Sequence, residues 1–540
     1  MVLTPMQRRF LPFVALTLLA SQQPVTTLPI LTYIKQSWTT LKRSDRDLAK
    51  AVVDPKFKPG PDGRWPLYIS RAEDAQMVEE GLRRDMPAAG FKTISIKQLP
   101  EDMDSLPQQG LLYLPKAYVV PGGRFNEMYG WDSYFIQVGL LKDNELELAK
   151  DMADNFLYQV KNYGKVLNAN RTYYLNRSQP PFLTQMVLGV YAKTHDKKWL
   201  AEALPLIERY YQLWSTEPHM TPETGLARYW DFGEGPAPEV LSDERDPQGR
   251  THYDLVQAYF RTHVVNDYRL NQYYDKQSDT LTPLFYKGDR SMRESGFDPS
   301  NRFGPFNIDI IHYNPVCLNS LLYLMETQTA DILTELDRKQ EAETWRAKAA
   351  IRAQAVNKLM WDAKDGLYYD YDFVNKHVRH YPFLTTFYPM WAGFATKEQA
   401  ARIVKNLPIF ERVGGLQTST EVSGNQWDSP FGWAPLEMIA VEGLRRYGYN
   451  ADAERISMKF LSLVKREYER TGFIVEKYDV VNGGSSVSAI HFGYSANQVG
   501  FGWTNAAFLQ MLDGLTPADR EAVLRDTRKT VAVPIASPKG

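Results

Sequence analysis

The sequence predicts an all-α protein folded as a helical toroid, an (α/α)6 barrel, with a small N-terminal extension. From about residue 130 onward, apolar residues recur with helical spacing. The predicted helices follow one another in hairpin-like pairs, and the motifs rich in polar and aromatic residues fall in loops where helices begin. A toroid opens its funnel at such loops, although a helical solenoid would show similar pairing.

The first residues resemble a targeting segment. Residues 1–24 place Gln7-Arg8-Arg9 before an apolar run at residues 10–20, as a secretory signal peptide does. The run is too short to span a bilayer as a mature helix. We therefore expect a periplasmic or secreted protein with no membrane segment in its mature form. If residues 1–24 are an ordinary hydrophobic helix, the expected location is cytoplasmic.

Residues 25–115 form the predicted extension, in which a connector ends in KPGPDGRWP and residues 68–115 mix short β-like pieces with helix. The toroid is predicted for residues 116–515, and residues 516–540 form a charged tail. Within the toroid, helices are expected at residues 143–163, 182–194, 197–214, 251–274, 312–336, 339–361, 396–406, 431–447, 451–469 and 500–513.

Composition narrows the classes of function. The 540 residues carry a net charge of −1, so no basic surplus favours nucleic acid as a partner. The 12 Trp, 32 Tyr and 25 Phe suit the apolar and polar faces of sugars, although an aromatic core accounts for them equally well. Cys317 is the single cysteine, which excludes an intrachain disulfide. We expect a monomer.

Two motifs combine hydrogen-bonding groups with aromatic rings. In PGGRFNEMYGWDSYF (121–135), glycines allow a tight turn, Arg124 offers a fork of donors, and Trp131 and Asp132 pair an aromatic face with an acceptor. The second motif, LNANRTYYLNRSQPPF (167–182), concentrates amides and guanidinium groups before a helix, and Asn168, Arg177 and Gln179 are among its donors. A capped helix start and a self-bonded polar loop are the plain structural alternatives.

Three further motifs follow. In RESGFDPSNRF (293–303), Asp298 lies beside aromatic residues that would raise its pKa, as a general acid requires, although it also suits a turn. QWDSPFGWAP (426–435) offers Trp427 as a stacking wall and Asp428 as an acceptor. The Gly- and Ser-containing stretch 476–505 suits a lid or a merely flexible loop.

The sequence favours neither a metal nor a cofactor. The eight histidines are scattered, and His377 and His380 lie three residues apart without an evident third ligand. The glycines of 476–505 lack the lysine that a phosphate-binding loop requires, and Gly-x-Ser-x-Gly is absent. A small carbohydrate remains the expected partner.

Taken together, PGGRF-x-E-x-Y-x-W-D-x-Y and QWD-x-P-x-GWAP resemble the two signatures of glycoside hydrolase family 37, the trehalases. The stretches RSQPP, SG-x-D, EKYD and GFGWTN also match in order, so the resemblance runs from about residue 112 to 513. It implies a six-hairpin (α/α)6 toroid that hydrolyses α,α-trehalose to glucose with inversion. It also implies that Asp298 is the general acid. The residues it places around the two sugars are Arg124, Phe125, Tyr129, Trp131, Asp132, Asn168, Arg177, Gln179, Glu239, Gly296 and Trp427.

Three positions depart from the family pattern. The resemblance assigns the general base to a glutamate of a GGGGEY loop before GFGWTN, but residues 480–503 contain neither Asp nor Glu, and Gly493 or Tyr494 stands there. Ala237 replaces an arginine of GPRPES, and Phe297 replaces a tryptophan. The base therefore stays unassigned, with Glu476, Asp479 and Glu421 as candidates.

The sequence accordingly predicts a trehalase-like glycoside hydrolase. Two alternatives remain: a glycosidase or transglycosidase with altered α-glucoside specificity, and a sugar-binding protein that has lost its base. An inverting enzyme needs carboxyl groups roughly 6.5–9.5 Å apart on opposite faces of the sugar.

Overall fold

The computed structural model describes residues 28–102, 106–242, 245–246, 248–493 and 496–525, and the predicted leader segment lies outside them. Within this part of the chain, no helix is both long and apolar enough to cross a membrane. Most buried hydrophobic side chains belong to one large core, which includes residues from α1 to the C-terminal helices.

Six helices of the described chain form a closed inner ring, because each contacts the next and the last contacts the first. The N-terminal ends of these helices carry the predicted motifs. In ring order they are α5 (Gly130–Lys142), α7 (Leu183–Thr194), α12 (Val316–Glu335), α14 (Tyr388–Ala392), α16 (Ala434–Arg446) and α18 (Gly502–Asp513).

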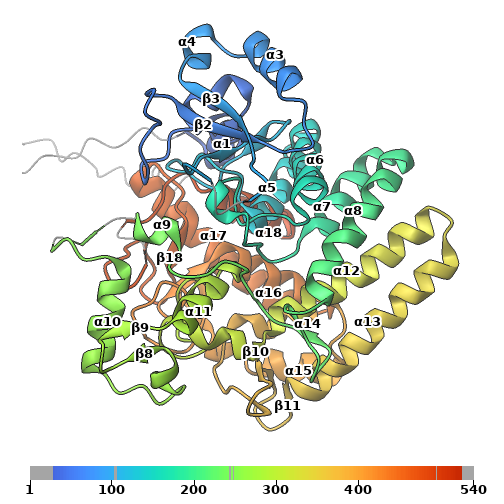
Figure 1. The fold of residues 1–540 in the computed structure, drawn as a ribbon. Coiled ribbons are helices and arrows are strands. Elements are labelled where there is room, and N and C mark those ends of the chain that lie inside the picture. The colour runs from blue at the N-terminus through green and yellow to red at the C-terminus, as the bar shows by residue number, and fades with distance from the viewer. Residues whose placement is uncertain (1–27, 103–105, 243–244, 247, 494–495, 526–540) are drawn as a thin grey trace, which may run out of the picture.

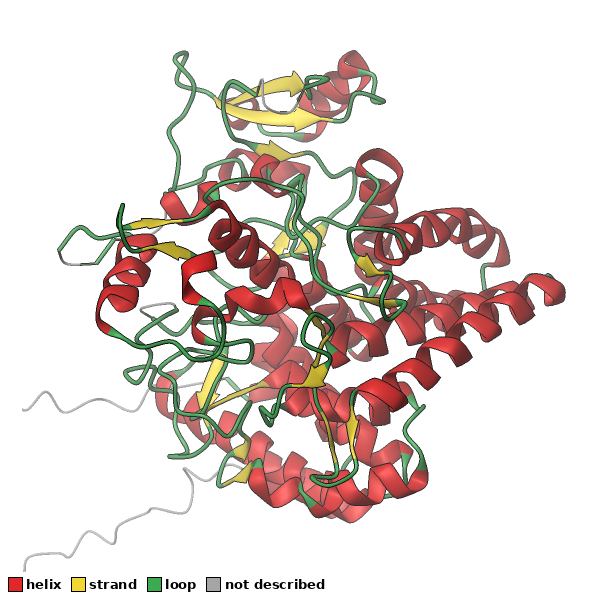
Figure 2. Cartoon of the chain, turned by 60° about the horizontal axis from the view of Figure 1, so that its bottom comes forward, coloured by secondary structure: helices red, strands yellow, loops and turns green. Residues whose placement is uncertain are grey.

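An outer layer of helices covers the ring (Figures 1 and 2). Five of them directly follow an inner helix in the chain, and α1, from the N-terminal extension, packs against α18. The outer helices are α1 (Ile30–Leu41), α6 (Leu146–Tyr163), α8 (Lys197–Ser215), α13 (Lys339–Leu359), α15 (Lys397–Lys405) and α17 (Asn450–Thr471). The predicted (α/α)6 toroid is therefore confirmed.

Small residues close the ring where its two ends meet. A Cβ on Gly139 of α5 would lie 2.7 Å from Ala506 Cβ of α18 and 2.9 Å from the Trp38 ring of α1. This space is too small for any side chain, so the glycine lets three helices from distant parts of the sequence pack together. The start of α5, which carries Trp131 and Asp132, is positioned by this contact.

The N-terminal extension forms a small α/β unit beside the ring (Figure 1, blue). Its parallel sheet has the order β3-β2-β4, formed by Ile94–Gln98, Trp65–Ile69 and Leu111–Leu112, and α3 (Ala75–Asp85) packs on β3. Arg171 joins the segment at residues 51–53, which precedes this sheet in the chain, to the toroid. Its guanidinium group donates to the backbone carbonyls of residues 51–53 and to Glu127.

The remaining elements are short. The helices are α2 (Leu48–Ala51), α4 (Ala88–Phe91), α9 (Pro238–Leu241), α10 (His252–Thr262), α11 (Pro283–Glu294) and α19 (Pro517–Leu524). The antiparallel pairs are β1 (Lys42–Arg43) with β5 (Tyr118–Val119), β6 (Met220–Thr221) with β7 (Leu226–Ala227), β8 (Tyr274–Asp275) with β9 (Thr280–Leu281), β11 (Trp361–Asp362) with β12 (Leu367–Tyr368), β15 (Glu411–Arg412) with β16 (Gly415–Leu416), and β17 (Phe431–Trp433) with β18 (Lys477–Asp479). In a three-stranded antiparallel sheet, β13 (Tyr371–Asp372) lies between β10 (Tyr313–Asn314) and β14 (His377–Val378).

The helix predicted at residues 251–274 is wrong in its second half. The helix α10 ends at Thr262, and the chain then enters the β8–β9 hairpin. The Asp275 carboxylate accepts the backbone N–H groups of Gln277 and Ser278, which fixes the turn. Local side-chain bonding of this kind competes with helix formation.

Candidate active site

A deep pocket opens where the inner helices begin. Its empty volume is about 1470 Å³, part of which is open to solvent. Its walls include Trp131 and Asp132 from the first turn of α5, Trp433 from the residue before α16, and Trp503 from the first turn of α18. The motifs therefore lie at the helix starts, where the sequence placed them.

The pocket brings together Asp298 and the substrate-binding residues named above, but not Asp428, which was also expected in its wall. They come from loops that are far apart in the sequence. The set is Arg124, Phe125, Tyr129, Trp131, Asp132, Asn168, Arg177, Gln179, Glu239, Gly296, Asp298 and Trp427.

Tryptophan rings form one wall of the pocket. The Trp427 and Trp433 rings stack 3.7 Å apart at an interplanar angle of 6°, and Trp131 lies 5.7 Å from Trp427. Gly296 has a φ of +77°, and a Cβ there would lie 2.8 Å from the Trp131 ring. This position therefore requires glycine both for its backbone conformation and for its close contact with the wall.

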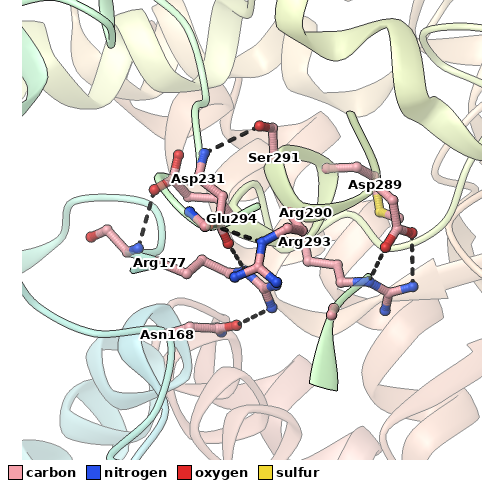
Figure 3. A network of polar contacts seen from close by, with 12 residues as sticks. Asn168, Arg177, Asp231, Asp289, Arg290, Ser291, Arg293 and Glu294 are labelled. Atoms are coloured by element: carbon pink, nitrogen blue, oxygen red, sulfur yellow. Dashed lines mark hydrogen bonds and ion pairs between the residues drawn. The ribbon is translucent and has the colours of Figure 1, made fainter. Parts of the chain in front are cut away.

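A network of buried ion pairs fixes the arginine side of the pocket (Figure 3). Arg177 donates from Nε to Asp231 Oδ2 and from Nη1 to Glu239 Oε1, both at 2.6 Å. Asp231 also accepts from Arg290 Nε at 3.1 Å. Because each charge has an opposite partner, this network holds Arg177 in one orientation although it is almost fully buried.

Three pocket-lining side chains keep buried polar atoms without a partner among the described residues. They are Nη2 of Arg177, Oε2 of Glu239 and Oε1 of Gln426. An unsatisfied buried polar atom costs roughly 1–3 kcal/mol. A ligand with several hydroxyl groups would satisfy the two acceptors and the donor together.

Asp298 has the properties of a proton donor. Burial raises its pKa from the ordinary 3.8 to about 7, against the opposing charges of Arg293 and Arg177. Its side chain is 31% exposed and lines the pocket, and its backbone carbonyl accepts from Gln426 Nε2. The carboxyl group is thus half protonated near neutral pH and accessible to a ligand.

Of the three candidate bases, only Glu476 lines this pocket. Its Oε2 accepts from the fully buried Lys477 Nζ at 2.6 Å. Asp479 is turned to a loop, where it accepts from Asn482, and Glu421 lines a different surface pocket. The expected Gly-rich loop brings Gly493 to the pocket, while Tyr494 lies outside the described residues.

Asp132 lies within electrostatic range of both carboxyl groups. Burial raises its pKa well above the ordinary value, and the charges of Glu476 and Asp298 raise it further. Asp132, Asp298 and Glu476 all line the same pocket.

Other predicted groups have structural positions. Asp428 does not line the pocket: it accepts from Tyr381, Ser419, Ser423 and the Asn301 backbone, and so ties loops together.

His380 does have acidic neighbours, since ligand atoms of Asp362, Asp365 and His380 lie within 4.8 Å of one another. These groups already bond to one another and to turn amides, so they give no reason to assign a metal.

Sequence reasoning missed several pocket-lining residues. Arg293 is the most important, because it lines the pocket from the last turn of α11, five residues before Asp298. Its position inside the RESGFD motif was the available signal. The others are Gln426, Arg250, His252, His491 and Phe492.

The closed ring of helix pairs defines an (α/α)6 toroid. The aromatic wall, buried arginines and carboxyl groups at one end of the ring form a site that suits a ligand with several hydroxyl groups. The sequence model of the family described as Trehalase matches residues 30–516. The chain therefore belongs to the trehalase family.

Comparisons with individual proteins agree. The chain is 39% identical to a cytosolic neutral trehalase of Saccharomyces cerevisiae over 75% of this chain and 58% of that protein. It is 37% identical to the cytosolic neutral trehalase of Emericella nidulans over 93% of this chain and 74% of that protein. The solved structure of neutral trehalase Nth1 from Saccharomyces cerevisiae is similar with a TM-score of 0.76 and 32% identity, covering 92% of this chain and 96% of that chain.

Proposed function

We propose that this protein hydrolyses α,α-trehalose to two glucose molecules with inversion, with Asp298 as general acid and Glu476 as general base. The carrying observation is that a carboxyl group with a pKa of about 7 and a second, lysine-paired carboxylate line the same pocket. The names of the relatives, all trehalases, support trehalose as the substrate.

The reaction follows from these roles. Glu476 takes a proton from a water molecule while the water oxygen forms a bond to the anomeric carbon of one glucose. The glycosidic bond breaks, and Asp298 gives its proton to the departing oxygen. Each of these proton transfers typically accelerates the reaction by about 10²–10⁴-fold. Both use side chains of this chain, and we propose that no cofactor takes part.

The substituted positions bear on recognition of the second glucose. Ala237 supplies no guanidinium, but Arg293 and Arg250 line the pocket from other segments. We propose that the guanidinium group of Arg250 replaces the missing donor, because Nε and Nη2 of Arg293 already donate to Asp289. Retention of trehalose as substrate is the consequence, rather than a shift to a different α-glucoside or to sugar transfer.

Two substitutions test the assignment of acid and base. Asp298→Asn and Glu476→Gln preserve side-chain size but cannot exchange the required protons. Glucose release from trehalose should fall by at least about 10²-fold in each. The controls Asp479→Asn and Glu421→Gln should keep their activity. Full activity in Asp298→Asn or Glu476→Gln would overturn the roles, and sugar binding without turnover in the wild-type protein would overturn the enzyme.

The location and oligomeric state are separate proposals. The relatives' names favour a cytoplasmic location, whereas the leader-like residues 1–24 favour export. We propose a cytoplasmic location. The test is cell fractionation followed by N-terminal sequencing of the purified protein, and a periplasmic form cut after Ala20 would contradict the proposal. We also propose a monomer, for which light scattering at a mass of 62.0 kDa is the test.

A further inference from the structure

Asp289 forms a bidentate ion pair with the guanidinium group of Arg293, which lies one helical turn later on α11. Arg293 donates from Nε to Asp289 Oδ2 at 3.1 Å and from Nη2 to Oδ1 at 3.0 Å, as Figure 3 shows. Asp289 is only 1% exposed, so this contact is shielded from water. Two of the three guanidinium nitrogens are therefore committed to Asp289.

The third nitrogen faces the general acid without bonding to it. Arg293 Nη1 lies 3.8 Å from Asp298 Oδ2, which is longer than a hydrogen bond. A freely moving arginine this close to a carboxylate would form a direct ion pair and hold the carboxyl group in its ionised form. An ionised Asp298 has no proton to give.

The proposal that follows rests on the assignment of Asp298 as general acid. We propose that Asp289 is a positioning residue for this acid: its carboxylate holds the Arg293 guanidinium away from Asp298 and balances its charge. Asp298 thereby keeps the proton that the departing sugar oxygen needs.

Asp289 is itself fixed by neighbouring elements. Tyr253 of α10 donates from its hydroxyl group to Asp289 Oδ2 at 2.9 Å. The same hydroxyl oxygen accepts the backbone N–H of Ala237, the residue at the substituted family position. His252 Nε2 lies 3.9 Å from Asp289 Oδ1. The carboxylate therefore has little freedom to release Arg293.

The charges around Asp298 agree with this arrangement. Arg293 on α11 and Arg177 before α7 lower its pKa, whereas burial and the charge of Asp289 raise it. Asp132 on α5 is also in range, since Asp298 raises the pKa of Asp132. The same pocket is also lined by Glu476, Glu239, Arg250 and His252. Removal of the Asp289 charge alone leaves two cations facing Asp298 with one counter-charge fewer.

The test is the pH dependence of kcat at saturating trehalose. Asp289→Asn keeps the side-chain size but removes the charge that balances Arg293. We expect the alkaline limb to move down by about one pH unit, so that kcat above the limb falls about tenfold while kcat at the acidic end changes little. Arg293→Gln should move the limb up, and in that background Asp289→Asn should move it down by less than it does in the wild-type protein.

The chain offers a matched control. Glu326 is buried, accepts from Arg352 Nε and Nη2, and accepts the Tyr211 hydroxyl group, but it lies between α12, α13 and α8, away from the pocket. Glu326→Gln should lose stability without moving the limb. With α-glucosyl fluoride, whose leaving group needs no proton, Asp289→Asn should behave as the wild-type protein does.

An unmoved alkaline limb in a folded Asp289→Asn variant would overturn the proposal. If that variant does not fold, Arg293→Gln decides: an unmoved limb there shows that Arg293 does not act on Asp298. The variant Asp298→Asn distinguishes failure of this proposal from failure of the proposed function. If Asp298→Asn stays active, Asp298 is not the general acid; if it is inactive and the alkaline limb of Asp289→Asn does not move, only the positioning role of Asp289 is wrong.

Discussion

Individual side chains give the pocket two carboxyl groups in different environments. Asp298 is partly buried, and the effect of burial on its pKa exceeds that of two arginines, while Glu476 accepts a hydrogen bond from a buried ammonium group. Such divergent environments are how a protein obtains an acid and a base from the same kind of side chain.

Lys477 has a direct effect on the proposed base. Lys477→Met removes the ammonium group that lies 2.6 Å from Glu476 Oε2 and leaves a buried carboxylate without this partner. We expect kcat to fall at least about tenfold. Lys465→Met is the control, because Lys465 is also buried and bonds Glu469 outside the pocket. Equal kcat values for the two variants would contradict this role.

Gly296 tests the fit of the aromatic wall. Gly296→Ala places a Cβ 2.8 Å from the Trp131 ring at a φ of +77°. Gly63 has a φ of +75° and open space around it, so Gly63→Ala carries the backbone strain alone. In urea denaturation we expect the free energy of unfolding to fall by about 1 kcal/mol for Gly63→Ala and by about 2–4 kcal/mol for Gly296→Ala. Similar losses in both would show that the contact with Trp131 relaxes at little cost.

The sequence predicted the residues that line the pocket better than the proposed pair of acid and base. Arg124, Arg177 and Trp427 belong to long motifs, so a resemblance places them directly. The base was left among three carboxylates, because the fold decides which one faces the pocket: Glu476 and Asp479 lie three residues apart, yet only Glu476 lines it. No pattern in the sequence separates these two without the β17–β18 pairing.

At the scale of helices, the prediction of paired helices held where one face is apolar, as in α6 and α17. It failed after Thr262, where the helix ends and the chain runs on to the β8–β9 hairpin, whose turn is fixed by bonds of the Asp275 carboxylate to the backbone. The sequence also did not predict the role of α1. This helix ends 89 residues before α5 begins, and its own residues give no sign that it completes the outer layer. Contacts between distant segments decide such positions.

The helix α1 should therefore contribute to the stability of the whole ring. Trp38 is 2% exposed, contacts Gly139 and donates from its indole N–H to Asp143. Trp38→Ala should lower the free energy of unfolding by about 3–5 kcal/mol in urea denaturation. Leu31→Ala, on the exposed face of the same helix, should change it by less than about 1 kcal/mol. Comparable effects would show that α1 is peripheral.

At the scale of the whole molecule, the raised pKa of Asp298 lowers the stability of the folded chain. The folded chain holds Asp298 with a pKa of about 7, against 3.8 for the ordinary group. Between about pH 4 and pH 7 the folded chain keeps a proton that the unfolded chain has released, so stability falls as pH rises through this window. Retention of the acid's proton is therefore obtained at a cost in stability.

Asp298→Asn should remove this cost. Its Tm should differ little from the wild-type Tm at pH 4, and the variant should become progressively more stable than the wild-type protein as pH rises to 7. Calorimetry at several pH values measures the difference, with Asp479→Asn as the control. A constant difference across this range would show that Asp298 has an ordinary proton affinity in the folded chain.

The most direct test of inverting trehalose hydrolysis by Asp298 and Glu476 is ¹³C NMR of the first products formed in ¹⁸O-labelled water from trehalose labelled with ¹³C at its anomeric carbons, because ¹⁸O shifts the resonance of the carbon that carries it. The wild-type protein should release α-glucose and β-glucose in equal amounts, with ¹⁸O in the β-anomer alone, and Asp298→Asn and Glu476→Gln should release neither. The presence of ¹⁸O in the α-anomer, or unchanged release by either variant, would contradict the mechanism.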